Sequence, residues 1–371
     1  MRVGCPKEIK NHEYRVGITP AAAREYVHAG HEVLIETQAG SGIGAHDDDY
    51  RKAGATVVDT AAEVFERADM VVKVKEPQPT EWAQLKPGQI LYTYLHLAAD
   101  KAQTEGLMAS GCTAIAYETV TAPEGGLPLL APMSEVAGRL SIQSAARSLE
   151  APAGGEGLLL GGVPGVAPAK VTVIGGGVVG THAAKMAIGL GADVTILDRS
   201  LPRLRQLDDL FGGRARCLYS TVEAIAENVA ASDAVIGAVL IPGASAPKLV
   251  TADMIRTMRK GTVVVDVAID QGGCFETSHA TTHADPTYLV DGVVHYCVAN
   301  MPGAVPKTSS HALNNATLRH GVMLANLGLE ALVRDPHLRN GLNVHRGQIV
   351  NQQVADSLSL DFCDPTTVLA A

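Results

Sequence analysis

Aromatic residues are scarce in this 371-residue chain, which has four Phe, nine Tyr and one Trp. A core with so few rings must consist mainly of Ala, Val, Leu and Ile, as in buried parallel strands covered by helices. Long uncharged runs are also missing. The longest stretch without Asp, Glu, Lys or Arg covers residues 292–306, which is too short to span a bilayer. We therefore expect no membrane partner.

Clusters of like charge and of cysteine are absent as well. Lys and Arg total 30 and Asp and Glu total 39, so the formal net charge is −9, and no block of five like charges occurs. This excludes the electrostatic footprint of a nucleic-acid-binding protein. The six cysteines are far apart with no C-x-x-C pair, and the charged N-terminus has no apolar signal core. We therefore predict a cytoplasmic protein with reduced thiols.

The chain does contain an alternation of short apolar runs and helical patterns from one end to the other. This rhythm predicts a parallel sheet with helices on both faces. Residues 151–169 are rich in Gly and Pro, and a second βαβ series follows them. We expect strands at 2–5, 31–36, 70–74, 90–95, 113–117, 170–174, 193–197, 234–238 and 263–267, and helices at 20–29, 101–109, 134–149 (capped by Ser134), 178–190, 201–211, 252–258 and 311–333. A polar tail without strong periodicity follows.

The strongest single motif is a glycine-rich turn that directly follows an expected strand. Residues 170–200 read KVTVIGGGVVGTHAAKMAIGLGADVTILDRS, in which Gly175, Gly177 and Gly180 occupy the positions of G-x-G-x-x-G. The first glycine permits a tight turn, the second lets a pyrophosphate approach bare backbone, and the third lets the helix lie close to the strand. Free N–H groups at the helix N-terminus attract phosphates. This context favours a dinucleotide site over a turn of purely structural use.

Asp198 ends the strand that follows this helix, 23 residues beyond Gly175. A carboxylate at this spacing accepts hydrogen bonds from a ribose diol and repels a 2′-phosphate. Arg199 and Arg203 come next and could tolerate a phosphate, but Asp198 lies at the ribose position itself. We therefore predict NAD as the cofactor.

Polar residues at expected strand ends mark a second candidate region, because ligands of open parallel sheets collect at the carboxyl ends of strands. Lys73 and Lys75 alternate along one strand, so both are expected on one side of it. His96 follows a second strand, and Asp270 follows a third, before a Gly-Gly turn. Arg15 lies in the charged N-terminal loop.

Each of these residues also has a purely structural interpretation. Lys75 could be a solvated amine and Arg15 part of a surface ion pair. His96 and Asp270 could cap local backbone. Their joint placement favours a binding or catalytic role over a structural one. An Arg and a Lys can bind a small carboxylate, and His is a general acid–base candidate near neutral pH. With a nicotinamide present, this set suits hydride transfer to and from a small charged acid.

Taken together, these motifs resemble the alanine dehydrogenase/transhydrogenase family, from the first residues to about Leu342. The matching stretches are VGCPKEIKNHEYRVGITP, VVKVKEPQP, LYTYLHLAAD, AIAYETV, LPLLAPMSEVAGRLS, LLLGGVPGV, VTVIGGGVVGTHAAKMA, IGAVLIPGASAPKLV, DVAIDQGGCFETS, YCVANMPGAVPKTS and ALNNATL. The resemblance implies an α/β fold of two Rossmann-like domains with parallel sheets, the nucleotide domain being inserted into a discontinuous substrate domain. The expected boundaries are 1–128 and 306–371 for the substrate domain and 129–305 for the NAD-binding domain.

The activity that the resemblance implies is the reversible, NAD-dependent oxidative deamination of L-alanine to pyruvate and ammonium. The family also suggests a homohexamer, built through the helix at 134–149. Two alternatives stay open. One is a saccharopine-type amino-acid dehydrogenase, and the other is the nucleotide-binding subunit of a transhydrogenase. Sequences of the latter group typically have Glu at the position of Asp270 and lack the His of LHLAA.

Carried over position by position, the resemblance implies that Arg15 and Lys75 bind the substrate and that His96 and Asp270 are the catalytic pair. The implied nucleotide contacts are Ser134, Gly175, Gly177, Val178, Val179, Gly180, Asp198, Arg203, Ser220, Val239, Leu240, Val267, Ala268, Ile269, Asp270, Val298, Ala299, Asn300 and Met301. Some relatives have an Arg near the position of His279. Some also bind a divalent ion through a Glu matching Glu118 and a His on the late helix. Residues 324–329 here contain no His, so we predict no protein-held metal.

Overall fold

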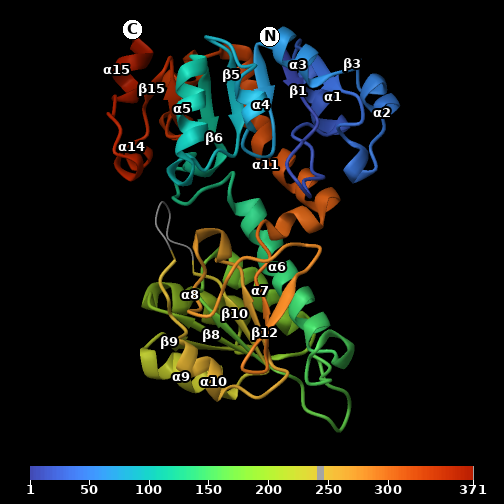
Figure 1. The fold of residues 1–371 in the computed structure, drawn as a ribbon, viewed down its shortest axis with the longest axis vertical. Coiled ribbons are helices and arrows are strands. Elements are labelled where there is room, and N and C mark those ends of the chain that lie inside the picture. The colour runs from blue at the N-terminus through green and yellow to red at the C-terminus, as the bar shows by residue number, and fades with distance from the viewer. Residues whose placement is uncertain (240–245, 371) are drawn as a thin grey trace. The chain divides into compact units, whose positions relative to one another are not determined.

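The chain folds into two compact units, each built around one sheet (Figure 1). The structure, a computed structural model, describes residues 1–239 and 246–370. Unit 1 comprises Met1–Met133 and Val305–Ala371, and unit 2 comprises Ser134–Ala304. The blue N-terminal and red C-terminal segments in Figure 1 therefore belong to the same unit. Both units have the α/β architecture with mostly parallel strands that the sequence predicts.

Unit 1 contains an eight-stranded sheet in the order β15-β14-β6-β5-β4-β1-β2-β3. Its parallel strands are β1 (Arg2–Cys5), β2 (Glu32–Glu36), β3 (Thr56–Val58), β4 (Met70–Val72), β5 (Ile90–Thr93) and β6 (Thr113–Ala116). β14 (Leu342–His345) and β15 (Gln348–Ile349) continue it in antiparallel pairing beside β6. The chain order reverses between β1 and β4, and doubly wound sheets bind their ligands at such a switch point.

The helices of unit 1 come from both ends of the chain. They are α1 (Pro20–His28), α2 (Asp47–Lys52), α3 (Ala61–Arg67), α4 (Pro79–Trp82), α5 (Lys101–Ser110), α11 (Pro306–Leu327), α12 (Glu330–Arg334), α13 (Pro336–Arg339), α14 (Gln352–Leu358) and α15 (Pro365–Ala370), with the 3-10 turns η1 (Ser41–Ile43), η2 (Leu97–Ala99) and η3 (Tyr117–Thr119). α1 begins after Thr19, whose hydroxyl accepts the Ala22 N–H. α11 begins at Pro306, five residues earlier than predicted, because proline suits the first helical position.

The C-terminal segment differs from the irregular tail that the sequence suggested. Val344, Ile349 and Val354 are buried in one cluster with Leu91 of β5 and Leu107 of α5. β14 pairs with β6, so this segment completes the sheet of unit 1. This pairing joins β14 to residues more than two hundred positions earlier, which no local pattern in the sequence indicates.

Unit 2 contains a seven-stranded sheet in the order β12-β13-β11-β10-β7-β8-β9. Its strands are β7 (Lys170–Ile174), β8 (Asp193–Asp198), β9 (Ala215–Tyr219), β10 (Ala234–Gly237), β11 (Val263–Asp266), β12 (Thr287–Val290) and β13 (Val293–Tyr296). β12 pairs antiparallel with β13, and the other pairs are parallel. The order reverses between β7 and β10, which places the switch point beside the glycine turn.

The helices of unit 2 connect these strands, apart from α6, which leads into the unit. They are α6 (Ala131–Ser148), α7 (Val178–Gly189), α8 (Leu201–Phe211), α9 (Val222–Ala231) and α10 (Ala252–Thr257), with the 3-10 turns η4 (Ala151–Ala153), η5 (Ile269–Gln271) and η6 (Met301–Ala304). Because α6 begins at Ala131, Ser134 lies inside the helix, and the prediction that it caps the helix is wrong. In the described part of the chain, no helix combines the length and hydropathy that crossing a membrane requires.

Candidate active site

The glycine turn of unit 2 has the backbone that its sequence requires. Gly175 has a φ of 104°, a conformation that side chains other than glycine rarely adopt. A Cβ on Gly175 would lie 2.7 Å from the Ala238 carbonyl oxygen, and one on Gly180 would lie 1.8 Å from the Gly175 carbonyl oxygen. The turn is therefore packed against both the end of β10 and the first turn of α7.

Gly177 is the glycine that leaves room for a ligand. It caps α7, and an ideal Cβ built on it meets no atom within 4 Å. Val178 is 42% exposed at the helix N-terminus, while Val179 is buried beneath it. The open backbone and the helix N-terminus together fit a pyrophosphate.

Asp198 and Arg203 both bind the glycine turn. The two carboxylate oxygens of Asp198 accept the N–H groups of Gly176 and Ser200, each at 2.7 Å. Arg203 donates from Nε to the Gly176 carbonyl oxygen at 2.7 Å and from Nη2 to Thr181 Oγ1 at 2.8 Å. Its guanidinium thus supports the turn, a role that the sequence did not indicate.

The other predicted nucleotide contacts of unit 2 follow strands that run parallel. Ser220 follows β9, Val239 follows β10, Val267, Ala268 and Ile269 follow β11, and Val298, Ala299, Asn300 and Met301 follow β13. Carboxyl ends of parallel strands share one edge of the sheet, so the structure brings these residues to the same edge as the glycine turn. Ser134 lies apart from them in sequence, within α6. Leu240 lies outside the described residues.

Asp270 lies in the exposed turn η5 that follows β11. Its Oδ1 accepts the backbone N–H of Asn300 at 3.2 Å. Asn300 has a φ of 57°, in the left-handed region. The catalytic carboxylate that the sequence predicts is therefore tied to the segment that follows β13.

Asp266, which sequence reasoning missed, holds the loop that carries Asp270. This carboxylate is fully buried at the end of β11 and accepts the N–H groups of Cys274 at 2.9 Å and of Ala268 at 3.2 Å. Burial raises the pKa of Asp266, against the effect of the hydrogen bonds that it accepts. The available signal was an acidic residue inside the apolar run VVVDVA.

In unit 1 the predicted residues follow three neighbouring parallel strands. Arg15 comes after β1, Lys75 after β4 and His96 after β5, and β4 lies between β1 and β5. They therefore lie at the carboxyl edge next to the switch point. Since β4 ends at Val72, the alternation that placed Lys73 and Lys75 on one side of a strand does not apply.

Lys73 and Lys75 have different surroundings. Lys73 is fully buried and donates to Glu8 at 2.9 Å and to Glu81 at 2.7 Å. The side chain of Lys75 is 15% exposed, and its Nζ lies 3.5 Å from Glu76 Oε2. Lys73 is thus enclosed by two carboxylates, whereas the side chain of Lys75 is partly exposed and pairs with Glu76.

Arg15 forms a buried ion pair and not a surface one. Its Nε donates to Glu13 Oε1 at 2.6 Å and its Nη2 to Glu13 Oε2 at 2.5 Å. Its Nη1 lies 3.2 Å from the Met133 sulfur. Glu13 therefore compensates the charge of Arg15 and fixes the plane of the guanidinium, which sequence reasoning did not foresee.

His96 has a left-handed backbone conformation, and Glu118 holds its backbone by a hydrogen bond. It has a φ of 53°, and its backbone N–H donates to Glu118 Oε1 at 2.6 Å. Its ring stacks on Tyr94 with centroids 5.8 Å apart and planes 5° from parallel, and Nδ1 lies 3.8 Å from Glu118 Oε1. The side chain is 46% exposed. A left-handed backbone at a non-glycine residue with an exposed imidazole suits a functional site.

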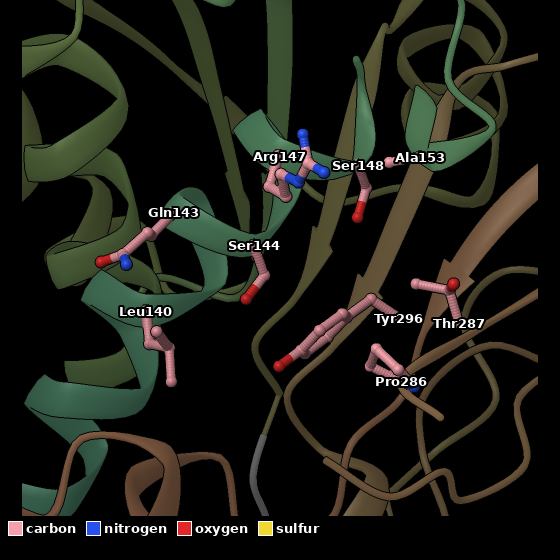
Figure 2. Close-up of a pocket in the computed structure, with 9 residues that line it drawn as sticks. All are labelled: Leu140, Gln143, Ser144, Arg147, Ser148, Ala153, Pro286, Thr287 and Tyr296. Carbon is pink, nitrogen blue, oxygen red and sulfur yellow. The ribbon is translucent and has the colours of Figure 1, made fainter. Parts of the chain in front are cut away.

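A separate hollow of about 340 Å³ lies in unit 2 between α6 and the β12–β13 pair (Figure 2). Its lining includes Leu140 and Ser144 of α6 and Tyr296 of β13. None of the predicted site residues contributes to this lining, so the hollow is distinct from the glycine turn. Within residues 1–239 and 246–370, no three His, Cys, Asp or Glu side chains are grouped so as to hold a metal ion.

The fold and the glycine turn define a nucleotide-binding α/β protein of two doubly wound units, with cationic and imidazole side chains at the ligand edge of unit 1. Comparison with family models narrows this class. Residues 4–137 match the N-terminal domain, and residues 141–352 the C-terminal domain, of alanine dehydrogenase/PNT. The chain belongs to this family.

Individual relatives agree with this membership. An alanine dehydrogenase of Halomonas elongata is 58% identical over 370 residues, which is 100% of each chain. A solved L-alanine dehydrogenase superposes with a TM-score of 0.94 at 57% identity, covering 97% of this chain and 99% of that one. A transhydrogenase from Sinorhizobium meliloti is more distant, with a TM-score of 0.82 at 26% identity over 94% of this chain and 100% of that one.

Proposed function

We propose that this chain catalyses the reversible, NAD-dependent oxidative deamination of L-alanine to pyruvate and ammonium. The observation that carries the proposal is the 58% identity, over the whole length of both chains, to a protein named alanine dehydrogenase. The positions of Arg15, Lys75, His96 and Asp270 support it. The transhydrogenase alternative is less supported, because that relative is only 26% identical.

Lys75 and Arg15 bind the carboxylate of alanine and orient its Cα–H bond. Because Glu13 compensates the charge of Arg15, we assign the net attraction to Lys75 and the directional contact to Nη1 of Arg15. Orientation of this kind can lower a barrier by roughly 7–11 kcal/mol.

The glycine turn fits the pyrophosphate of NAD, and Asp198 fits the adenosine ribose. The fit rests on the open backbone at Gly177 and on the N-terminus of α7. When bound, NAD supplies the acceptor for the hydride of the substrate Cα. The remaining chemistry is proton transfer, which the side chains of this chain provide.

Loss of a proton from the substrate ammonium group and of hydride from Cα leaves an iminium, which water attacks to give a carbinolamine and then pyruvate with ammonium. These steps need a base that takes a proton from water and an acid that delivers one to nitrogen. We assign them to His96 and Asp270 as a pair. Glu118 holds the backbone of His96, and Asp266 holds the loop of Asp270.

The proposed function is tested by following NADH absorbance with purified protein, NAD and each of several amino acids. We expect a rate with L-alanine, and the reverse signal with pyruvate, ammonium and NADH. A protein that gives no change in absorbance in either direction would contradict the proposal, and this is the result expected of a transhydrogenase component.

The charge of Asp198 leads to a prediction on cofactor choice. The wild type should prefer NAD to NADP by at least about 100-fold in kcat/KM, because the carboxylate repels a 2′-phosphate. Asp198→Gly should reduce that ratio. Since Asp198 also accepts the Gly176 N–H, Asp198→Asn serves as the control that keeps an acceptor oxygen and removes the charge. An unchanged NAD/NADP ratio in both variants would contradict the assigned role.

We also propose that the protein is a cytoplasmic homohexamer. Family resemblance supports the assembly, and α6 offers a face with exposed Gln143 and Arg147 beside the hollow of Figure 2. Light scattering coupled to size exclusion measures the mass directly. A mass near that of one 38.6 kDa chain would contradict the hexamer.

A further inference from the structure

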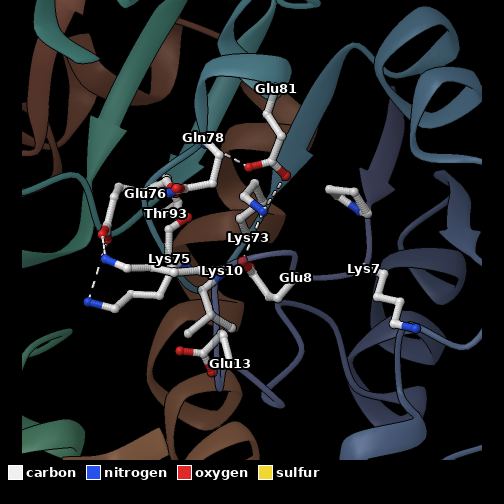
Figure 3. A network of polar contacts seen from close by, with 12 residues as sticks. Lys7, Glu8, Lys10, Glu13, Lys73, Lys75, Glu76, Gln78, Glu81 and Thr93 are labelled. Carbon is white, nitrogen blue, oxygen red and sulfur yellow. Dashed lines mark hydrogen bonds and ion pairs between the residues drawn. The ribbon is translucent and has the colours of Figure 1, made fainter. Parts of the chain in front are cut away.

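Lys75 belongs to a trio of charged side chains that also contains Glu76 and Lys10. Nζ of Lys75 lies 3.5 Å from Glu76 Oε2, and Nζ of Lys10 contacts Glu76 Oε1 (Figure 3). The side chain of Glu76 is 13% exposed, whereas that of Lys10 is 41% exposed. Two cations thus share one largely buried carboxylate, and the trio has a net positive charge.

The two contacts to Glu76 are unequal. Lys10 donates a hydrogen bond to Oε1, whereas the buried Oε2 accepts no hydrogen bond from any residue that the structure describes. At 3.5 Å, Lys75 is within ion-pair distance of Oε2 but beyond an ordinary N–H···O bond. Lys10 therefore holds Glu76 by a hydrogen bond, whereas Lys75 holds it by charge alone.

Glu76 remains a charged competitor for Lys75. Burial raises the pKa of the Glu76 carboxyl, but Lys75 and Lys10 outweigh burial and hold that pKa at about 2. The carboxylate is therefore ionised at neutral pH and attracts the same ammonium that a substrate carboxylate would bind. Lys10 offsets part of the negative charge of Glu76 and so weakens the attraction between Glu76 and the Lys75 ammonium.

The backbone of Lys75 is fixed independently of the trio. Its N–H donates to Glu8 Oε1 at 3.3 Å, and its carbonyl oxygen accepts from Thr93 Oγ1 at 3.1 Å. Glu8 in turn accepts from the buried Lys73. A substitution at Lys10 or Glu76 should therefore alter the charge around the Lys75 ammonium more than the course of its backbone.

We propose that Glu76 is the resting counter-ion of Lys75, and that Lys10 retains Glu76 when Lys75 binds the substrate carboxylate. The inference rests on the proposed function, in which that carboxylate belongs to L-alanine or pyruvate. Lys10 acts on the substrate only through Glu76 and Lys75, so it is a positioning residue. It sets how strongly Lys75 binds an anion and does not take part in the chemical steps.

The test is a double-mutant cycle of Lys10→Met and Glu76→Gln, measured by steady-state kinetics with pyruvate, ammonium and NADH. Lys10→Met leaves Lys75 as the principal partner of Glu76, so KM for pyruvate should rise about fivefold with kcat changed less than about twofold. Glu76→Gln removes the competitor and should lower this KM. In the Glu76→Gln background, Lys10→Met should have no further effect on KM.

Two further variants separate charge from damage to the fold. Lys10→Arg keeps the charge and should stay within about twofold of the wild-type KM. Lys7→Met removes a charge from the same loop, and Figure 3 draws no contact between Lys7 and Glu76, so its KM should not change. An equal rise in KM in both backgrounds, or a loss confined to kcat, would overturn the inference. A wild type that does not turn over pyruvate would overturn the proposed function itself.

Discussion

Replacing Asp270 with Asn is expected to lower kcat for L-alanine oxidation by roughly 10²–10⁴-fold while NAD still binds. The amide keeps the size of the side chain and an oxygen that can accept the Asn300 N–H, but it cannot take up or release a proton. Tight positioning is therefore retained and proton transfer is lost. Steady-state rates give kcat, and fluorescence or calorimetric titration gives the affinity for NAD.

Asp285→Asn is the matched control for this experiment, because Asp285 is an exposed acid of the same unit. Its kcat should equal that of the wild type. If Asp270→Asn retains a tenth or more of wild-type turnover, Asp270 does not carry an essential proton transfer. If turnover and NAD affinity fall together, Asp270 serves mainly to hold its loop.

Replacing His96 with Ala should lower turnover by a comparable factor, roughly 10²–10⁴-fold. The imidazole is 46% exposed and stacks on Tyr94, so its removal leaves no cavity in the core and the thermal midpoint should change little. A loss of turnover below about tenfold would assign His96 a structural role.

A Glu118→Gln variant distinguishes the contribution of the His96 imidazole to turnover from that of Glu118, which holds the His96 backbone. Glu118 accepts the backbone N–H groups of Leu95 and His96, which an amide oxygen can also accept. We therefore expect a smaller loss for Glu118→Gln than for His96→Ala. The reverse order would indicate that the Glu118 carboxylate itself takes part in the reaction.

The features that could be predicted from the sequence are those with a local physical cause. Gly175 needs a positive φ and Gly180 a missing side chain, so the turn could be located without the fold. The role of Asp198 could be predicted from its spacing after the glycine turn. Arg15, Lys75 and His96 could be placed at one edge because parallel strands end on the same side of a sheet.

The features that could not be predicted depend on contacts between distant segments. Glu13 and Arg15 are close in the chain, but their burial depends on the packing of the whole unit. In the sequence, Lys73 and Lys75 occupy equivalent positions. In the structure, Glu8 and Glu81, from other segments, form ion pairs with Lys73 and enclose it. The pairing of β14 with β6 likewise joins residues more than two hundred positions apart.

The central claim, hydride transfer between a nicotinamide and the Cα of alanine, is tested most directly by isotope transfer. The protein is incubated with pyruvate, ammonium and NADH carrying two deuterium atoms at C4 of the nicotinamide, and the products are analysed by mass spectrometry and NMR. The account predicts L-alanine with one deuterium on Cα. Alanine without deuterium, or deuterium recovered only in a second nicotinamide nucleotide added to the mixture, would contradict it.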